Sequence, residues 1–307
     1  MDVLVTGGAG FIGSHVVDAL VARGDSVRVL DDLFSGSVEN VNQAADLVTG
    51  SAAEEAVVRD AVEGAEVVWH QAAHRAVLRS VEDPLATDTA NVHGTLTVLK
   101  AAADAGVRRV VYASSSSVYG GAEQLPTPES APTLPRSPYA VSKLVGEHYC
   151  RVFAELYGLE TVALRYFNVF GPRQRPDSAY AAVIPLFIEA LRAKEPPIVH
   201  GDGHQSRDFT YISDVVAANL TASAAPAQVC SGRAYNIAAG EAHSLLDLLS
   251  FLQGILGVDV PPVHTESRAG DVRHTRADPS AARRDLGFEC EVGFEAGLIH
   301  TVRSFDS

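Results

Sequence analysis

The sequence predicts an α/β fold in which a doubly wound parallel sheet carries a smaller, interleaved C-terminal domain. In the first half, short runs rich in Val, Ile and Leu alternate with longer stretches whose apolar residues recur at helical spacing. This alternation is typical of parallel βαβ units with helices on both faces of the sheet. The runs are continuously apolar, as in VRVL and VVWH, which favours strands buried on both faces.

The expected elements follow in order along the chain. The expected strands cover residues 2–6, 26–30, 65–70, 109–113 and 161–166, and the expected helices cover 11–22, 84–105 and 139–157. From about residue 170 the pattern changes to short segments and prolines, yet 235–239 (YNIAA) again resembles a sheet strand. We therefore expect a first domain over 1–168, with 205–240 returning to it, and a second domain over 169–204 and 241–307.

Composition and net charge exclude some classes of binding partner. The 307 residues are 47% hydrophobic and 20% charged, the balance of an ordinary globular protein. A formal net charge of −14 leaves no overall basic surface for nucleic acid or for an anionic membrane. An anionic ligand must therefore be held by a few arginines and backbone amides.

Cysteine usage and the first residues indicate the cytoplasm. Cys150, Cys230 and Cys290 are far apart and odd in number, a spacing that fits neither a disulfide framework nor a metal-binding motif. No apolar run reaches the length of a membrane span, and MDVLVTGG lacks the basic region of a signal peptide. We expect a cytoplasmic protein that binds no metal, nucleic acid or membrane.

A glycine-rich segment between the first strand and the first helix predicts a dinucleotide site. The segment TGGAGFIG at 6–13 carries Gly7, Gly10 and Gly13, and Phe11 and Ile12 open the helix. Glycines permit a tight turn and a close approach of the backbone to a pyrophosphate, which is held at the helix N-terminus.

The end of the second strand indicates which dinucleotide is bound. Asp31 stands 18 residues after Gly13 and is followed by Asp32, not by an arginine. A carboxylate at this place accepts hydrogen bonds from the adenosine ribose hydroxyls and repels a 2′-phosphate. The sequence therefore favours NAD over NADP.

A tyrosine and a lysine four residues apart are the catalytic candidates. Tyr139 and Lys143 follow the helix-start pair Ser137-Pro138 and share one face of the helix. A phenol, with a pKa of about 10, is a poor base at neutral pH, and a nearby ammonium stabilises the phenolate. Upstream, the strand at 109–113 leads into the hydroxyls of 114–117 (SSSS), at the edge where such sheets place their chemistry.

Together these motifs resemble the extended short-chain dehydrogenase/reductase family, and within it the NAD-dependent nucleotide-sugar epimerases and dehydratases. The resemblance covers nearly the whole chain. The matching segments are GGAGFIG, Asp31, HQAA at 70–73, Asn91, SSSSVYG at 114–120, SPYAVSK at 137–143, LRYFNVFGPRQ at 164–174, RDFTYISDV at 207–215 and RAGDVRHTRAD at 268–278. It implies a Rossmann-type sheet, tightly bound NAD, and a homodimer formed through the helices at 84–105 and 139–157.

The resemblance also implies catalytic and cofactor-binding roles by position. Tyr139 takes the proton of a sugar hydroxyl, Ser115 is the hydroxyl beside it, Lys143 tunes the tyrosine, and Ser116 and Ser117 complete the catalytic segment. The residues implied to bind NAD are Gly7, Gly10, Phe11, Ile12, Gly13, Asp31, Asp32, Gly50, Ser51, Gln71, Ala72, Ala73, Asn91, Tyr139, Lys143 and Tyr166.

For the substrate, the resemblance implies contacts from the second half of the chain. Asn168 contacts the diphosphate sugar, and Arg207 and Arg268 grip the diphosphate, since a guanidinium pairs with phosphate in a bidentate way. Asp271 holds the uridine ribose. The remaining residues of the implied substrate site are Arg75, Ser115, Val183 and Thr275.

Two departures from relatives bear on the fate of the sugar once carbon 4 has been oxidised. Sugar 4,6-dehydratases carry Asp-Glu where this chain has Ser116-Ser117, and UDP-glucuronate decarboxylases carry Glu at the second position. Elimination needs an acid and a base that serines supply poorly. Thr275, where epimerases of plain hexoses carry a tyrosine, and the small residues of 181–183 (AAV) favour an N-acetylated sugar. We therefore expect a UDP-N-acetylglucosamine 4-epimerase.

Two alternatives stay open. The UDP-N-acetylglucosamine 5,6-dehydratase of the tunicamycin pathway shares the first oxidation step, and the Ala- and Val-rich, Lys-poor composition fits an actinobacterial antibiotic pathway. A non-catalytic NAD-binding scaffold would use the same fold. The complete set of Ser115, Tyr139 and Lys143 argues against the scaffold.

Overall fold

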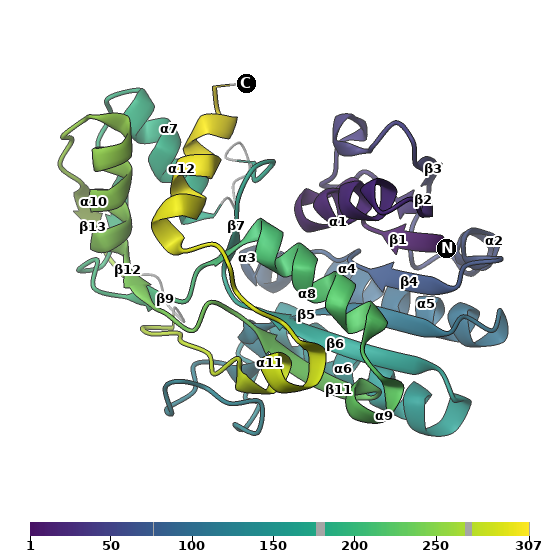
Figure 1. Cartoon of the computed structure of the whole chain (residues 1–307). Helices are drawn as coiled ribbons and strands as arrows, with labels where there is room; N and C mark the ends of the chain where they lie inside the picture. Colours follow the sequence, from purple (N-terminus) through teal and green to yellow (C-terminus); the bar gives the residue numbers. More distant parts are fainter. Residues whose placement is uncertain (76, 176–181, 268–271, 307) are drawn as a thin grey trace.

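The computed structural model describes residues 1–75, 77–175, 182–267 and 272–306, which form a central sheet with helices on both faces (Figure 1). The sheet has seven parallel strands in the order β11-β6-β5-β4-β1-β2-β3. Its strands are β1 (Asp2–Thr6), β2 (Ser26–Asp31), β3 (Asp46–Thr49), β4 (Val67–His70), β5 (Arg109–Ser115), β6 (Glu160–Tyr166) and β11 (Arg233–Ile237). The predicted doubly wound fold is confirmed.

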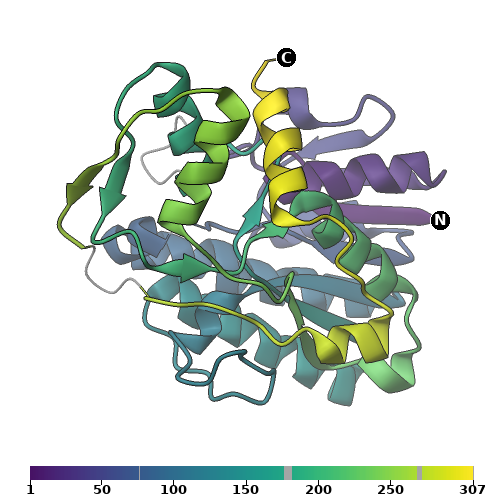
Figure 2. The ribbon, with the colours of Figure 1, turned by 60° about the vertical axis from the view of Figure 1, so that its left-hand side comes forward.

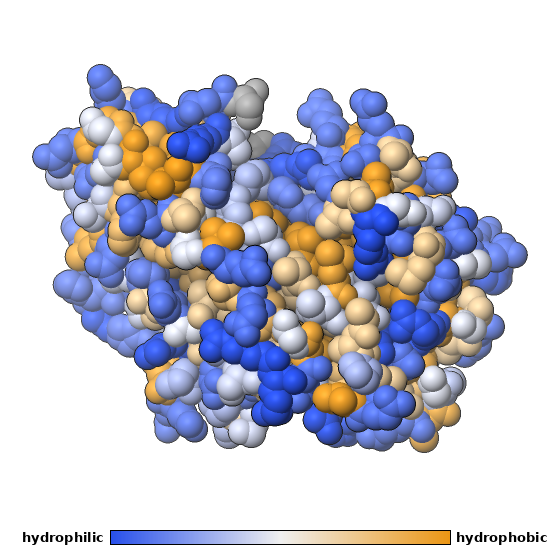
Figure 3. All heavy atoms as spheres, viewed as in Figure 1, coloured by the Kyte–Doolittle hydropathy of each residue, from blue (hydrophilic) through white to orange (hydrophobic). Residues whose placement is uncertain are grey.

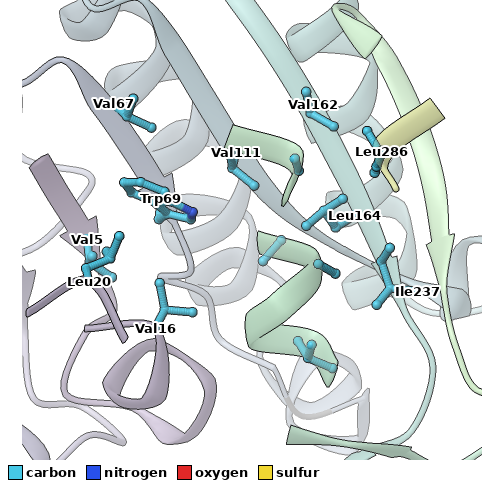
Figure 4. Packing of buried hydrophobic residues seen from close by; sticks show 14 of the residues in the cluster. Val5, Val16, Leu20, Val67, Trp69, Val111, Val162, Leu164, Ile237 and Leu286 are labelled. Atoms are coloured by element: carbon cyan, nitrogen blue, oxygen red, sulfur yellow. The ribbon is translucent and has the colours of Figure 1, made fainter. Parts of the chain in front are cut away.

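The continuously apolar strands divide their side chains between two cores, because successive residues of a strand point to opposite faces. Val5 of β1 and Trp69 of β4 belong to the first core, while their neighbours Leu4 and Val68 belong to the second. Figure 4 shows Val5 and Trp69 beside side chains of α1 in the first core.

Helices close the two cores from opposite sides. The first core is covered by α1 (Phe11–Ala22), α8 (Ile212–Ala224), α9 (Ala227–Cys230) and α11 (Ser280–Leu286). The second is covered by α2 (Glu55–Val62), α5 (Gly94–Asp104) and α6 (Pro138–Tyr157), with α3 (Val77–Glu82) and α4 (Pro84–Asp88) preceding α5. The outer face seen in Figure 3 is mainly hydrophilic, with hydrophobic side chains in small groups.

A third core lies in the C-terminal part of the chain. Its helices are α7 (Val183–Arg192), α10 (Leu245–Leu256) and α12 (Phe294–Ser304). Its short strand pairs are β7 (Val169–Phe170) with β10 (Thr210–Tyr211), β8 (Ile198–His200) with β13 (Val263–Thr265), and β9 (Ser206–Arg207) with β12 (His243–Ser244). This part lies beyond the carboxyl ends of the central strands (Figures 1 and 2), so the two parts face each other at the edge where we expect the chemistry.

The chain returns to the main sheet late, as β11 pairs with β6. This strand covers Arg233–Ile237, two residues earlier than predicted from YNIAA, because its register with β6 begins at Arg233 opposite Val162.

The domain boundaries expected at 168, 205 and 240 stay a prediction. No helix in the described ranges is both long and apolar enough to cross a membrane.

The long helix predicted over 84–105 is helical from Pro84 to Asp104, but it is not α-helical throughout. A π-helical turn, Thr89–His93, lies between α4 and α5. Asn91 lies in this turn with its side chain only 1% exposed, bonded to His74 and Ser142. Such turns often occur at functional sites, and here the turn directs Asn91 to partners that helical spacing alone does not reveal.

Candidate active site

A cavity of about 700 Å³ lies at the carboxyl ends of the central strands, where the sheet meets the C-terminal part. Of the predicted site residues that the structure describes, all line this cavity except Asn91 and Val183. Arg268 and Asp271, and also Ala181, lie outside the described residues. One cavity therefore gathers side chains that the sequence placed in separate motifs.

The glycine-rich turn forms one wall of the cavity. Gly7 has a φ of +72°, and a Cβ on it would lie 2.6 Å from the backbone nitrogen of Ala72. A Cβ on Gly13 would overlap the Gly7 carbonyl oxygen. No side chain caps the N-terminus of α1 at Gly10, so backbone N–H groups there are available to an anion. Only glycine permits this close packing, which leaves a cradle of the shape a pyrophosphate needs.

Asp31 is fixed beside this cradle by backbone groups. Its Oδ2 accepts a hydrogen bond from the Ala9 N–H at 2.9 Å, and its Oδ1 accepts one from the Leu33 N–H at 2.8 Å. The side chain is 7% exposed, and burial raises the pKa of its carboxyl group. The cradle and an oriented carboxylate beside it, with Gly50 and Ser51 nearby in the lining, fit the phosphates and adenosine ribose of NAD.

The catalytic candidates meet at the ends of β5 and α6. Ser115 at the end of β5 and Tyr139 near the start of α6 both line the cavity. Burial raises the pKa of Tyr139, and the Ser115 hydroxyl together with the charge of Arg75 opposes the rise. Burial is the largest of these effects, so the surroundings of the phenol favour its protonated form.

Lys143 is held by the backbone of β5 on the same side of α6 as Tyr139. Its ammonium donates a hydrogen bond to the Ala113 carbonyl oxygen at 2.8 Å and lies 6.0 Å from the centre of the Tyr139 ring. Burial lowers the pKa of Lys143 to about 7. The ammonium is thus held close to the ring by the backbone of β5, and its predicted effect on the phenol stays a prediction.

The serine segment rests on a buried polar network. The Ser114 hydroxyl donates to Glu147 Oε1 at 2.5 Å, and Arg165 donates to both oxygens of Glu147, from Nε at 2.9 Å and from Nη2 at 2.7 Å. Arg165 Nη1 also donates to the Tyr119 hydroxyl at 2.7 Å. Because the partners come from β5, α6 and β6, this network fixes the end of β5 beside Tyr139.

A second network, which sequence analysis missed, lies under the cofactor side of the cavity. Asn219 of α8 is fully buried, and its Nδ2 donates to the Tyr166 hydroxyl at 2.8 Å. Gln71 Nε2 donates to Asn219 Oδ1 at 3.0 Å. Gln71 and Tyr166 line the cavity, while Asn219 holds both from behind. In the sequence, Asn219 stands out only as a polar residue within the short apolar run VVAANL at 215–220.

Two predicted contact residues have other positions. Asn91 donates from Nδ2 to the His74 carbonyl oxygen at 3.1 Å and accepts from the His74 N–H at 2.7 Å, so it fixes the loop after β4 and does not reach the cavity. Val183 opens α7 and packs against the third core. Its neighbour Ala182 lines the cavity instead. The π turn directs the Asn91 side chain toward the loop after β4, and the start of α7 directs the Val183 side chain toward the third core.

The substrate side of the cavity is built around Asn168 and Thr275. Asn168 Nδ2 donates to Thr275 Oγ1 at 3.3 Å and to the Asp208 carbonyl oxygen at 3.1 Å. The Asp208 N–H also donates to Thr275 Oγ1, at 3.3 Å. Arg207 and Arg75 reach the same cavity with cationic side chains. This side therefore offers the positive charge that an anionic ligand needs in an acidic protein.

Asp208 is a second residue that sequence analysis did not single out. It is fully buried, and its carboxylate accepts hydrogen bonds from the N–H groups of Gly240 and Ala277. Burial raises its pKa to about 7, against these hydrogen bonds. Asp208 thereby joins three separate chain segments behind Arg207 and Thr275.

The chain is similar to known proteins along nearly its whole length. Residues 3–238 match the model of the NAD dependent epimerase/dehydratase family. A UDP-glucose 4-epimerase of Mycolicibacterium smegmatis is 40% identical over 99% of this chain and 98% of its own length.

Solved structures give the same result. The UDP-glucose 4-epimerase of Thermotoga maritima, solved with UDP-glucose, is 38% identical with a TM-score of 0.96, covering 100% of this chain and 99% of that one. A UDP-N-acetylglucosamine 4-epimerase of Methanobrevibacter ruminantium, in complex with UDP-N-acetylmuramic acid, is 38% identical with a TM-score of 0.93, covering 99% and 98%. The chain belongs to the NAD-dependent epimerase/dehydratase family, and it is an enzyme of nucleotide-sugar metabolism.

Proposed function

We propose that this enzyme is a 4-epimerase that interconverts UDP-N-acetylglucosamine and its 4-epimer, with NAD retained between turnovers. The observation that carries the proposal is the chemistry beside Tyr139. Within the described lining of the cavity, Asp31 and Asp32 are the only carboxylates, and both stand at the end of β2 on the adenosine side. Ser116 and Ser117 face the cavity where elimination would need an acid and a base.

The proposed mechanism uses Tyr139 as the base. Tyr139 accepts the proton of the sugar 4-hydroxyl and returns it once the 4-keto sugar has turned its other face. When bound, NAD supplies the acceptor and then the donor of the hydride at carbon 4. Ser115 lines the cavity together with Tyr139, and Gln71 and Tyr166 shape the cofactor side of the same cavity. Because one cavity holds all these groups, proximity supplies a large part of the rate.

The proposed substrate rests on charge and on side-chain size. Arg207 and Asn168 line the cavity where a diphosphate would be held, and guanidinium groups suit that ligand. The side chains that line the sugar region include Ala182 and Thr275, both small. We expect this space to accept an acetamido group, with Arg268 and Asp271 as further proposed contacts.

One incubation tests the reaction. The purified enzyme, without added NAD, meets UDP-N-acetylglucosamine in heavy water, and NMR and mass spectrometry follow the product. A product of unchanged mass, inverted at carbon 4 and free of solvent deuterium, supports epimerisation. A product lighter by one water with exocyclic vinyl signals would instead establish the 5,6-dehydratase, which shares the first step. No product from this or other UDP-sugars would leave the scaffold hypothesis.

The variant Tyr139→Phe tests the mechanism on the same substrate. Loss of the base lowers kcat by about 10²- to 10⁴-fold, the usual contribution of a general base. Bound NAD and the thermal unfolding temperature stay close to those of the unmodified enzyme, because the ring is retained. Turnover that stays unchanged would exclude Tyr139 as the base.

A further inference from the structure

Asp208 is a buried carboxylate that holds backbone groups of two distant segments. It stands between β9 and β10, is 0% exposed, and does not occur in the described lining of the cavity. Its Oδ2 accepts a hydrogen bond from the Ala277 N–H at 2.9 Å, and both of its oxygens accept from the Gly240 N–H at 3.2 Å. A backbone N–H can only donate, so the direction of each bond is fixed. The side chain of Asp208 therefore holds the segments at 240 and 277 against the link between β9 and β10.

The backbone of the same residue faces the substrate side of the cavity. The Asp208 N–H donates to Thr275 Oγ1 at 3.3 Å, and the Asp208 carbonyl oxygen accepts from Asn168 Nδ2 at 3.1 Å. Asn168 and Thr275 both line the cavity. Ala277, which the carboxylate of Asp208 holds, stands two residues after Thr275 in the chain. One buried residue thus contacts two lining side chains with its backbone and fixes the segment of one of them with its carboxylate.

These contacts decide the direction of the Thr275 hydroxyl. Its Oγ1 accepts from the Asp208 N–H and from Asn168 Nδ2, each at 3.3 Å. Both donors are certain, because one is a backbone N–H and the other is an amide group that also lies against a carbonyl oxygen, which can only accept. A hydroxyl has two acceptor positions and one hydrogen, so Thr275 is left to donate. With its Nδ2 engaged twice, Asn168 is left to accept through Oδ1.

We propose that Asp208 is a positioning residue for the substrate: its carboxylate holds the segment of Thr275, and its backbone orients the Thr275 hydroxyl and the Asn168 amide for the sugar nucleotide. The proposal rests on the proposed function, in which Asn168 and Thr275 meet the substrate. It gives Asp208 no chemical step, since the residues that Asp208 holds stand between it and the cavity. Loss of the carboxylate should therefore lower the affinity for the substrate and spare both bound NAD and the step at Tyr139.

Asp214 provides a matched control for the loss of a buried carboxylate. It is 2% exposed, and its oxygens accept hydrogen bonds from the backbone N–H groups of Glu291 at 3.1 Å and Val292 at 3.3 Å. It also stands outside the described lining of the cavity. Asp208→Ala and Asp214→Ala both leave backbone N–H groups without their acceptor, which lowers stability in each variant. Only Asp208→Ala removes the support of Thr275.

Affinity is measured by calorimetry in the NAD-containing Tyr139→Phe background, where binding is separated from turnover. Asp208→Ala should raise the Kd of UDP-N-acetylglucosamine roughly tenfold, the effect of losing the direction of one or two hydrogen bonds. Asp214→Ala should leave this Kd unchanged, and both variants should keep their NAD. With Tyr139 intact, KM should rise by the same factor in Asp208→Ala while kcat stays within about threefold. An unchanged Kd in Asp208→Ala, or an equal rise in Asp214→Ala, would overturn the proposal.

A double-mutant cycle tests whether Asp208 acts through Thr275. Thr275→Val removes the hydroxyl and keeps the shape of the side chain, so it should itself weaken the binding of UDP-N-acetylglucosamine. In the Thr275→Val background, Asp208→Ala should raise the Kd by only about threefold, because the two changes remove part of the same interaction. A full tenfold rise in that background would contradict an action through Thr275.

The binding of UDP separates the failure of this proposal from that of the proposed function. Arg207 directly precedes Asp208 and lines the cavity, so Asp208→Ala should also weaken UDP, which carries the diphosphate without the sugar. If the enzyme binds UDP but converts no UDP-N-acetylglucosamine, the proposed function fails, and a weaker binding of UDP to Asp208→Ala than to Asp214→Ala still supports the positioning role. If turnover occurs and Asp208→Ala binds both ligands like the parent, the positioning role is wrong.

Should Asp208→Ala unfold, Asp208→Asn takes its place in these measurements, because it keeps the size of the side chain and one acceptor oxygen. Its Kd for UDP-N-acetylglucosamine should rise by about threefold, less than the loss of both oxygens would cause. An Asn variant that binds like the parent would contradict the proposal.

Discussion

At the scale of single residues, Gly7 shows how a missing side chain makes a site. A Cβ at this position would collide with the backbone of Ala72. The residue would also have to keep the φ of +72°, which side chains other than glycine rarely adopt. Gly24 provides a matched control, since its φ is +90° and nothing lies within 4 Å of a Cβ built on it. The two glycines therefore separate backbone strain from steric collision.

We expect Gly24→Ala to lower the free energy of unfolding by about 1 kcal/mol, the strain of a positive φ alone. Gly7→Ala should cost more, on the order of 3 kcal/mol, because the turn must also move away from the strand ends. It should also strip NAD from the purified enzyme. Chemical denaturation and the NAD content of each variant measure both effects. Equal stability of the two variants, with NAD retained in both, would mean that the cradle tolerates a side chain.

His70 connects the fold to acid stability. Its ring hydrogen-bonds the hydroxyls of Thr6, at 2.7 Å, and Thr95, at 3.0 Å. Complete burial, and then the charge of Lys143, lower its pKa to about 3. In the unfolded chain the pKa of histidine is about 6.5, so only the unfolded state gains a proton between these values.

The stability that neutral His70 contributes is present above about pH 6.5 and is lost progressively as the pH falls toward 3. His70→Gln cannot titrate, so its free energy of unfolding should fall less steeply between pH 7 and pH 4. Thermal unfolding of both proteins across that range measures the difference. Identical slopes would show that His70 is protonated in the folded protein, against the effect of its burial.

At the scale of elements, local sequence patterns correctly predicted the helices, strands and turns that are determined by residues close together in the chain. The strand at 2–6, the helix at 11–22 and the glycine turn between them follow from spacing alone, and the structure has them at those residues. The π turn at Asn91 and the contacts of Asn219 and Asp208 did not follow, because their partners lie far away in the chain. Sequence spacing places a motif, but long-range hydrogen bonds decide which side chain faces the cavity.

The loops after β2 and β4 show a further long-range contact, which joins them across the cofactor side of the cavity. The Phe34 ring stacks on His74 with centres 4.0 Å apart and an angle of 17°, and the Arg79 guanidinium lies 4.7 Å from the Phe34 ring. Phe34 and His74 both line the cavity that contains the glycine turn. The stack therefore connects two loops that NAD would have to pass between.

We expect Phe34→Ala to release NAD faster, by roughly tenfold for the loss of a stacked aromatic pair and its cationic neighbour. The exchange of bound NAD for labelled NAD measures this directly. Val38→Ala is a suitable control, since Val38 stands in the same loop region, is 56% exposed and does not line the cavity. An exchange rate that is the same in both variants would show that the stack does not retain the cofactor.

At the scale of the whole molecule, exposed apolar side chains occur on neighbouring helices. The helices α3, α4 and α6 pack against one another. Their exposed apolar residues include Val81 (62%), Leu85 (79%) and Val141 (46%). Exposed apolar side chains on neighbouring helices favour association, and two of these helices fall in the segments where the resemblance implies a dimer.

We expect the enzyme to be a dimer through this surface, and Leu85→Asp to weaken the dimer at least roughly tenfold, because a charge would be buried without a partner. Light scattering coupled to size-exclusion chromatography across a range of concentrations measures the mass. Ile198→Asp is the control, since Ile198 is 57% exposed on β8, in the C-terminal part. Because Val141 lies two residues from Tyr139 on α6, loss of the dimer should also loosen the start of this helix and lower kcat more than it changes NAD content. A parent enzyme that is monomeric at every concentration, or a Leu85→Asp variant that remains as dimeric as Ile198→Asp, would contradict this interface.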